Sequence, residues 1–452
     1  MITDFVRRIT RPESPDWIIR SLLDVDFYKF TMGYFIYRLH RGVQVQFSFI
    51  NRNLKIPFAT IIDEQELRAQ LDHVRTLRLR HTDLVYLRGQ DVYGHNMFSE
   101  EYLQFLSTLQ LPSYTLTRVD DQYELSFKGT WEVVTFWETI ALAVISELFY
   151  RSLMRSMTEL ELRVLYARAT DKLYAKLTRL QAHPRIRFAD FGQRRRHSFL
   201  WQQFAINMSR DILGARFTGT SDTWMAFNQD LTPIGTNAHE LPMVLTALAD
   251  GNEAKQQAQY TVLTEWGPMF TQGGLRIMLP DTYGSLQFFQ NMPKELAQEV
   301  AHNWRGMRQD SGDPIAEGKF FMDWLTRQGA DPSKKLFIPS DGLDVDPMIT
   351  IDDALGNGVE LSNGLGTMLT NDFIGCHPRG NEQAVVRGQP LNFTWDEIFR
   401  GHSIVCKVQT ANGKPAVKLS NNVNKATGPK SEVLEYLKIF GQSGRTSQEV
   451  FV

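Results

Sequence analysis

Six short polar loops, each following an apolar or β-branched run, constrain the fold of this chain more than any other feature. They are rich in glycine, serine, threonine and aspartate and lie at residues 190–194, 219–222, 235–240, 308–313, 340–342 and 362–366. Most of them precede a helical pattern, as expected when each strand of a βα repeat ends in a polar loop. Their spacing, roughly one βα unit with one longer gap, predicts an irregular (βα) barrel with its active site on one rim.

The two ends of the chain follow a different pattern. Residues 43–50, 114–119 and 123–130 alternate with period two, which is typical of half-buried strands. Asn412-Gly413 between two further alternating runs predicts a β-hairpin. We therefore expect an α/β protein with three parts, which are an N-terminal α+β domain with an antiparallel sheet (1–137), an α/β-barrel catalytic domain (138–375) and a C-terminal segment that packs with the N-terminal domain (376–452).

Within the barrel domain, one long helical region is predicted over 138–180 and a helix over 241–266. The most apolar long stretch, residues 131–150, carries Glu132, Glu138 and Glu147. These charges favour a buried helix over a membrane span.

Charge and cysteine content limit the cellular compartment and the classes of partner that this chain can have. The chain has 452 residues and a formal net charge of −2, so it carries no electrostatic footprint for nucleic acid. Cys376 and Cys406 show no CxxC spacing, which fits a reducing cytosol and argues against structural zinc and a disulfide scaffold. Residues 1–8 lack the apolar core of a signal peptide. We expect a cytoplasmic protein with neither nucleic acid nor membrane among its partners.

The loops at 340–344 and 362–367 are candidates for phosphate binding. Glycine lets backbone N–H groups approach phosphate oxygens, and the following helix adds its positive N-terminus. Glycines in such turns often serve only the backbone geometry of the turn. Two tandem instances with hydroxyl or amide neighbours favour a phosphate-binding site. Asp310 and Asp341 could hold a diol, or Mg²⁺ through water rather than directly. Asp313 is better explained as the cap of a helix that starts at Pro314.

His239 precedes a predicted helix and is the candidate nucleophile or base. A histidine in this position is more often structural, but Gly235, Thr236 and the carboxylate of Glu240 favour a chemical role. The sequence has no GxSxG, GxxxxGK[ST] or HExxH motif. Near Phe191, an aromatic face next to guanidinium groups suits a flat anionic ring, although Phe191 could equally be a core residue.

Together these motifs resemble the nicotinate phosphoribosyltransferase family. The matching segments follow the family's order from about residue 22 to 428 and lie at 23–32, 190–195, 217–222, 235–243, 308–314, 340–344, 362–369, 417–422 and 425–428. The resemblance implies that nicotinate and phosphoribosyl pyrophosphate give nicotinate mononucleotide and pyrophosphate, coupled to ATP hydrolysis with Mg²⁺.

The resemblance also implies roles for individual residues. His239 would be phosphorylated by ATP, Phe191 would stack on the pyridine ring, and Arg194 would stand near it. Tyr28 would cover the ring from the partner subunit of a head-to-tail homodimer whose active site lies at the interface. The residues expected to hold phosphoribosyl pyrophosphate are Arg308, Asp310, Asp341 and Gly342, with Gly364 and Gly366 at its 5′-phosphate.

Substrate choice is expected to depend on the loop at 219–222. Ser221 would suit the carboxylate of nicotinate, whereas Asp222 would repel it by about 1 kcal/mol or more at 4 Å if it faced the ring. We expect Asp222 to point away and cap a helix that begins at Thr223. A nicotinamide phosphoribosyltransferase is the alternative enzyme. A barrel lyase or aldolase would need a Schiff-base lysine at a strand end, and a non-catalytic binding protein would not need these loops together.

Overall fold

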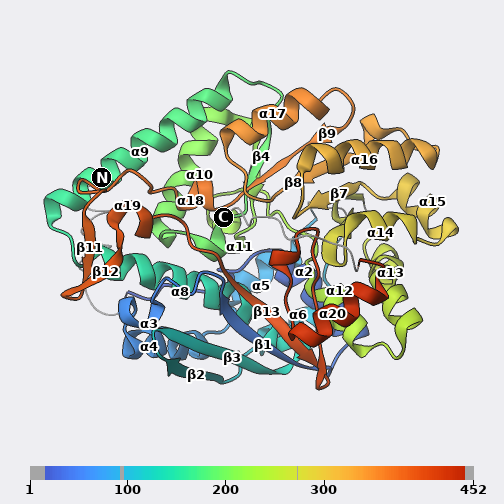
Figure 1. Ribbon diagram of the computed structural model, residues 1–452. Helices are drawn as coiled ribbons and strands as arrows, with labels where there is room; N and C mark the ends of the chain where they lie inside the picture. The colour runs from blue at the N-terminus through green and yellow to red at the C-terminus, as the bar shows by residue number, and fades with distance from the viewer. Residues whose placement is uncertain (1–15, 92–95, 272, 443–452) are drawn as a thin grey trace.

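The chain forms a mixed α/β structure in which parallel strands and an antiparallel sheet are separate (Figure 1). The computed structural model describes residues 16–91, 96–271 and 273–442. The prediction that residues 1–8 form no signal peptide therefore lies outside the described residues.

The antiparallel sheet has five strands in the order β14-β13-β1-β3-β2. Their bounds are β1 (Gln44–Asn51), β2 (Tyr114–Val119), β3 (Gln122–Thr130), β13 (Ile404–Ala411) and β14 (Lys414–Pro415). In β1, every second side chain is buried, as its period-two sequence predicts. The strand predictions for 43–50, 114–119 and 123–130 are confirmed, and so is the hairpin that turns at Asn412-Gly413.

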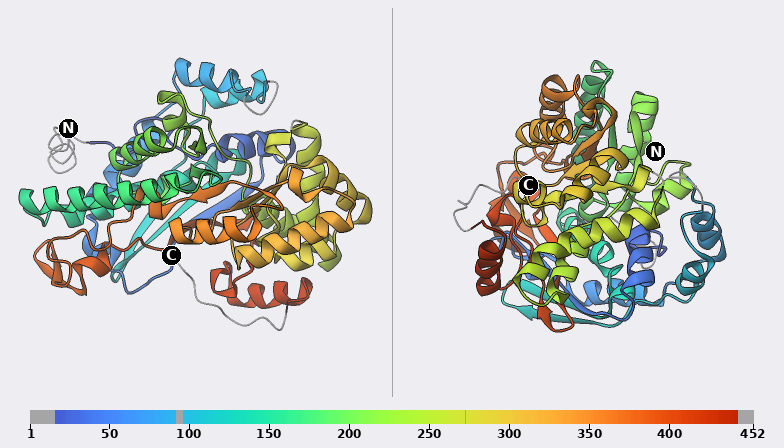
Figure 2. Two further views of the ribbon diagram at one scale, coloured as in Figure 1. Left: turned by 90° about the horizontal axis from the view of Figure 1, so that it is seen from above. Right: turned by 90° about the vertical axis from the view of Figure 1, so that its right-hand side faces the viewer.

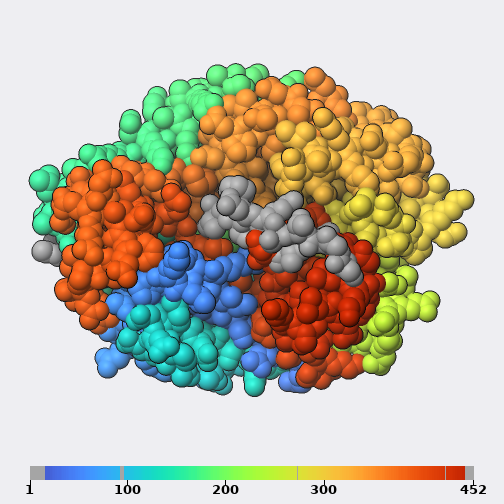
Figure 3. Space-filling model, viewed as in Figure 1, coloured from blue at the N-terminus to red at the C-terminus, as the bar shows by residue number. Residues whose placement is uncertain are grey.

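Strand β1 pairs with β3 on one side and with β13 on the other, so residues from both ends of the chain share one sheet. Figure 3 shows this arrangement from outside, with C-terminal residues in orange and red next to N-terminal residues in blue. A hairpin of β11 (Gln383–Val386) and β12 (Gln389–Thr394) precedes β13.

Small helices surround the antiparallel sheet and connect its strands. They are α2 (Tyr28–Leu39), α3 (Phe58–Ile61), α4 (Glu64–Thr76), α5 (His81–Arg88), α6 (Glu100–Ser107), α7 (Trp131–Val134), α19 (Trp395–Ile398) and α20 (Lys430–Ile439). Helix α20 packs on a separate small core, where the rings of Tyr283 and Phe440 stack with centroids 4.1 Å apart.

The long helical region predicted over 138–180 is two helices, α8 (Trp137–Met154) and α9 (Glu159–Gln181). The break occurs because Thr158 and Glu161 form a capping box that starts a new helix. Residues 131–154 are long and apolar enough to cross a membrane, but 94% of the 18-residue window that meets this criterion is buried inside the structure, and every residue of α8 is buried. The expected buried helix is thus confirmed.

The parallel strands form two sheets, in the orders β10-β4-β5 and β6-β7-β8-β9. Their bounds are β4 (Phe188–Asp190), β5 (Phe217–Thr220), β6 (Ile277–Met278), β7 (Gly306–Gln309), β8 (Leu336–Pro339), β9 (Glu360–Leu361) and β10 (Asn363–Leu365). Between the described residues, strand pairing does not close into one ring. The α/β class with a separate antiparallel sheet is confirmed, and closure of the barrel stays a prediction.

Helices of the repeat lie on the outside of the parallel strands (Figures 1 and 2). They are α10 (Phe199–Leu213), α11 (Thr223–Asn228), α12 (Glu240–Leu248), α13 (Asn252–Met269), α14 (Ser285–Gln290), α15 (Lys294–Asn303), α16 (Pro314–Arg327), α17 (Val345–Leu355) and α18 (Thr367–Thr370). The single helix predicted over 241–266 is wrong, because the chain breaks between α12 and α13. Gly251, with φ 82°, takes the left-handed conformation that this turn requires.

Candidate active site

A cavity of about 160 Å³ opens at the carboxyl ends of β4, β7 and β8 and is closed on its other side by the antiparallel sheet. Many of the predicted site residues line it, namely Phe191, Arg194, Arg308, Asp310, Asp341, Gly342 and Gly366. We call the loops that carry them the parallel-strand wall. The sequence therefore placed residues that are up to 175 positions apart around one cavity, as expected for strands that end on one edge.

Local geometry fixes the two aspartates of this wall. Asp310 follows the last residue of β7, while Asp313 caps α16 by accepting from the backbone N–H groups of its first turn, as predicted. Asp341 follows β8 in a turn where Gly342 has φ 58°, a conformation that favours glycine. The two carboxylates thus reach the cavity from adjacent strands.

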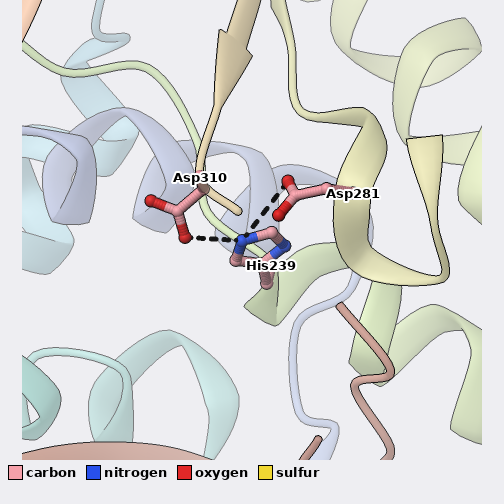
Figure 4. A group of neighbouring side chains, drawn as sticks. All are labelled: His239, Asp281 and Asp310. Atoms are coloured by element: carbon pink, nitrogen blue, oxygen red, sulfur yellow. Dashed lines mark hydrogen bonds and ion pairs between the residues drawn. The ribbon is translucent and has the colours of Figure 1, made fainter. Parts of the chain in front are cut away.

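His239 lies behind Asp310 and is almost fully buried. Its Nε2 is 2.9 Å from Asp310 Oδ2 (Figure 4). Its Nδ1 is 2.9 Å from the hydroxyl of Thr282. Burial and the nearby charge of Lys418 lower the pKa of His239 to about 4, although Asp281 and Asp310 oppose this shift. The imidazole is therefore neutral at physiological pH, the form that acts as a nucleophile.

Asp310 is an ionised hub between this histidine and two cations. Burial alone would raise the pKa of Asp310. The hydrogen bond with His239 and the charges of Arg308 and Lys418 outweigh this effect and hold the pKa of Asp310 well below its usual range. Lys418 Nζ is 3.7 Å from Asp310 Oδ2, and burial lowers the pKa of Lys418 to about 8. Asp310 therefore stays a carboxylate that can stabilise positive charge in the cavity.

His239, Asp281 and Asp310 could together contact a metal ion. One ligand atom of each residue lies within 4.8 Å of the others, and Figure 4 shows the two carboxylates on either side of the imidazole. Among the described residues, Asp281 Oδ1 has no hydrogen-bond partner. Carboxylate oxygens are the ligands that Mg²⁺ prefers, so the donor set fits a hard divalent cation better than a soft one.

A buried ion-pair network anchors the helix that follows His239. Lys29 Nζ lies 2.7 Å from Glu240 Oε2 and 2.6 Å from Glu138 Oε2, and all three side chains are at least 97% buried. Trp131 donates its indole N–H to the other oxygen of Glu240. Removing one member would leave an unpaired buried charge, which typically costs about 3–5 kcal/mol. Glu240 thus fixes the start of α12 rather than the tautomer of His239.

The predicted ring-binding residues gather at one end of the cavity. Gly364 does not line the cavity. A Cβ atom at Gly364 would lie 2.5 Å from ring atoms of Phe191. This glycine thus leaves room for the Phe191 ring, and its contact with the 5′-phosphate stays a prediction. The Tyr28 ring centroid lies 5.9 Å from the Arg194 guanidinium of the same chain. Its contribution from a partner subunit stays a prediction. The Tyr28 phenol donates to Glu138.

Ser221 and Asp222 both lie just behind this end of the cavity. Asp222 is fully buried, caps α11 through the N–H of Met225 and pairs with Arg196, which confirms that it points into a cap. Ser221 does not line the cavity, and its hydroxyl is 2.5 Å from Asp26 Oδ1. Asp26 in turn lies 3.1 Å from Arg194 Nε. The sequence analysis missed Asp26, although it stands within the motif at 23–32.

The opposite side of the cavity is basic, and the sequence analysis assigned none of its residues. This antiparallel-sheet wall consists of Arg52, Lys407, Lys418 and Lys425. Lys425 pairs with Asp341 and Lys407 pairs with Glu138. Two of these lysines, Lys418 and Lys425, belong to the matching segments at 417–422 and 425–428. Membership in these segments was the sequence signal that could have identified them as site residues. The four cations of this wall make the cavity suited to a polyanion such as a diphosphate.

Two family models match this chain. The model described as the nicotinate phosphoribosyltransferase (NAPRTase) family matches residues 186–443, and the model of the NAPRTase N-terminal domain matches residues 23–146. The chain belongs to the nicotinate phosphoribosyltransferase family. It is therefore a phosphoribosyltransferase, and the family implies nicotinate and phosphoribosyl pyrophosphate as substrates.

Solved structures agree with this assignment. The chain is similar to the crystal structure of nicotinate phosphoribosyltransferase from Porphyromonas gingivalis, with a TM-score of 0.76, 28% identity, and coverage of 94% of this chain and 100% of that one. For the Vibrio cholerae enzyme, the TM-score is 0.79, the identity 27%, and the coverage 96% of both chains. A putative nicotinate phosphoribosyltransferase from Saccharomyces cerevisiae shares the fold, with a TM-score of 0.76 at 23% identity over 94% of this chain and 99% of that one.

Proposed function

We propose that this enzyme makes nicotinate mononucleotide and pyrophosphate from nicotinate and phosphoribosyl pyrophosphate in NAD biosynthesis, and couples the reaction to ATP hydrolysis through a phosphohistidine at His239. The observation that carries the proposal is the contact between neutral His239 and ionised Asp310 at a cavity with a basic wall. Neighbouring groups with opposed protonation preferences are typical of sites that transfer phosphoryl or glycosyl groups.

The basic wall would bind the diphosphate group of phosphoribosyl pyrophosphate. Lys418 and Lys425 contact Asp310 and Asp341 directly, so the diphosphate would bind beside these lysines and the ribose beside the two carboxylates. Mg²⁺, when bound, supplies further positive charge on the departing pyrophosphate. Asp310 and Asp281 are the residues whose oxygens would hold it, directly or through water.

Displacement at the ribose is expected to pass through an oxocarbenium-like state. The carboxylates of Asp310 and Asp341 would stabilise the positive ring, and the basic wall would stabilise the negative pyrophosphate that leaves. The pyridine nitrogen of nicotinate already has a free lone pair, so the reaction needs no general base. The protein therefore acts by positioning and charge.

The ATP step would use the imidazole of His239. Thr282 holds Nδ1, while Nε2 faces Asp310, which lines the cavity, so Nε2 is the nitrogen that a phosphoryl group can reach. Because Asp310 is ionised, Nε2 carries the imidazole proton and would first pass it to Asp310. The lone pair freed in this way attacks the terminal phosphorus of ATP, the bond to ADP breaks, and water later hydrolyses the phosphohistidine to phosphate and free histidine. The added charge, about −1.5 to −2 by analogy with other phosphorylated side chains, would rearrange this loop and tighten substrate binding.

The test is product formation from phosphoribosyl pyrophosphate with nicotinate or nicotinamide, each with and without ATP. We expect nicotinate turnover that ATP raises. His239→Ala should abolish the ATP stimulation and leave a weak ATP-independent activity, whereas His302→Ala, at an exposed position on α15, should respond to ATP as the unaltered protein does. A normal ATP response in the His239→Ala variant would refute the phosphohistidine.

Nicotinamide is the alternative ring substrate, and one contact favours it. Because the Ser221 hydroxyl gives its proton to Asp26, a ring substituent that reached it from the adjoining end of the cavity would meet only lone pairs, which suit the N–H groups of an amide. A preference for nicotinamide in the same assay would assign this alternative. Turnover of neither compound would leave the family fold without the proposed reaction.

A further inference from the structure

Two short segments of opposite charge lie against each other beside the ring end of the cavity. Asp24 pairs with Arg196, and Asp26 pairs with Arg194, so the residues pair in crossed order. The inner pair is closed, since both carboxylate oxygens of Asp24 accept from Arg196 at 2.8 Å and both side chains are at least 99% buried. The outer pair faces the cavity, because the Arg194 side chain is 34% exposed and lines it.

The outer pair controls what Ser221 can offer a substrate. An ionised carboxylate only accepts hydrogen bonds, and a serine hydroxyl has one proton. The 2.5 Å contact therefore commits the Ser221 proton to Asp26. Ser221 then cannot donate to the carboxylate of nicotinate. In the part of the chain that the structure describes, Asp26 is the only carboxylate paired with Arg194, and the contact uses Nε.

Asp26 also sets the charge at this end of the cavity. It offsets the charge of Arg194 at a place where a negatively charged ring substituent would have to bind. The other charged or titratable groups near Asp26 are Glu138, Lys29, Tyr28 and Asp190. Glu138 and Glu240 are balanced by Lys29 and Lys407, which leaves Asp26 as the carboxylate that decides the charge balance around Arg194.

This step rests on the proposed function. We infer that Asp26 is a specificity-determining positioning residue, which sets the choice between an acid and an amide on the ring by holding both the Arg194 guanidinium and the Ser221 proton. Arg194 is then the donor that reads the carboxylate, and Ser221 acts only through Asp26. The negative charge of Asp26 limits how strongly nicotinate is preferred.

Asp26→Asn tests this directly, because asparagine keeps the shape and removes the charge. Its amide can donate to Ser221, which frees the serine proton for the substrate while Arg194 loses its counter-charge. We expect the ratio of kcat/KM for nicotinate over nicotinamide to rise at least about tenfold, which is the weak end of what one unit charge a few ångströms away contributes between bulk water and a protein surface. The change should lie in the KM values, with a lower KM for nicotinate and an unchanged kcat.

Ser221→Ala separates direct reading from indirect reading. In the unaltered protein, Ser221→Ala should change the KM for nicotinate less than threefold. In the Asp26→Asn background, Ser221→Ala should reverse part of the decrease in the KM for nicotinate that Asp26→Asn causes. A tenfold or larger rise in the KM for nicotinate from Ser221→Ala alone would show that Ser221 reads the acid itself. That result would overturn the inference.

Asp24→Asn is the matched control, since it makes the same chemical change two residues away at the closed pair. It should lower the melting temperature and affect both ring substrates alike. If the unaltered protein uses nicotinate and Asp26→Asn leaves the selectivity ratio unchanged, the inference fails and the proposed function stands. If the unaltered protein does not turn over nicotinate at all, the proposed function fails, and the inference fails with it.

Discussion

The two walls of the cavity differ in chemistry and in origin. The parallel-strand wall supplies carboxylates and glycine turns from loops that directly follow strands, as at Asp310, Asp341 and Gly342. The antiparallel-sheet wall supplies cations, and they come from a strand, from the residue after β1 and from an irregular segment after β14. The parallel-strand wall carries both signs of charge, because Arg194 and Arg308 stand beside its carboxylates, whereas the antiparallel-sheet wall carries cations alone. Together they separate the positive and negative halves of a glycosyl transfer.

This division assigns separate tasks to the walls. The parallel-strand wall should control the chemical step, because its carboxylates stabilise charge that develops only in the transition state. The antiparallel-sheet wall should control the binding of phosphoribosyl pyrophosphate, whose diphosphate is already charged in the ground state. Substitutions in the two walls should therefore change different kinetic constants.

The largest effect is expected from Asp310→Asn, which removes charge from the parallel-strand wall and keeps its shape. We expect kcat to fall about 10²–10³-fold, as is typical when one preorganised electrostatic contact is lost. Steady-state kinetics with saturating substrates measures it. Asp313→Asn in the same loop should stay within twofold, because asparagine also caps a helix well. A loss of kcat in both variants would mean that the loop matters only for folding.

The second effect is expected in the other wall, from Lys418→Met. Losing one charge-assisted contact of about 1.5–3 kcal/mol should raise the KM for phosphoribosyl pyrophosphate roughly 10–100-fold with a smaller change in kcat. Lys414→Met is the control, since that lysine is exposed on the hairpin and pairs with Asp250. If Lys418→Met lowered kcat alone, the division of tasks between the walls would be wrong.

The smallest effect is expected from Gly364→Ala, which acts on the support of the ring site. The new methyl group would meet the Phe191 ring at 2.5 Å and push it toward the cavity. We expect the KM for nicotinate to rise about tenfold, in line with the roughly 1–1.5 kcal/mol of a disturbed aromatic contact. Gly273→Ala, at a position with no neighbouring atom within 4 Å, should leave it unchanged. A rise in the KM for phosphoribosyl pyrophosphate instead would place Gly364 at a phosphate.

The parallel-strand wall could be predicted from the sequence because its information is local. Asp310 and Asp341 follow short apolar runs, and strands of one parallel sheet end at the same edge. Caps such as Asp313 and Asp222 are also local, since they depend on a residue type and the next turn of helix.

The antiparallel-sheet wall depends on contacts between distant residues. Lysines at 407, 418 and 425 look like ordinary surface residues until β13 pairs with β1 and turns them toward the cavity. The same limit explains Ser221, whose predicted role assumed a free hydroxyl. Only the tertiary structure places Asp26 against it. The breaks within the two long predicted helices were missed for a different reason. The apolar pattern continues across both breaks, near Thr158 and Gly251.

The pairing of β1 with β13 has a consequence for the synthesis of the protein. Strand β1 is made about 350 residues before β13. Until β13 follows, one edge of β1 has no final partner, and an open strand edge readily pairs with other chains. Domains fold as they emerge and distant pairings form slowly, so the growing chain carries an aggregation hazard while these residues are made. The same delay keeps the cavity incomplete, so a nascent chain could not hold phosphoribosyl pyrophosphate between the two walls before β13 and the lysines after it have been made.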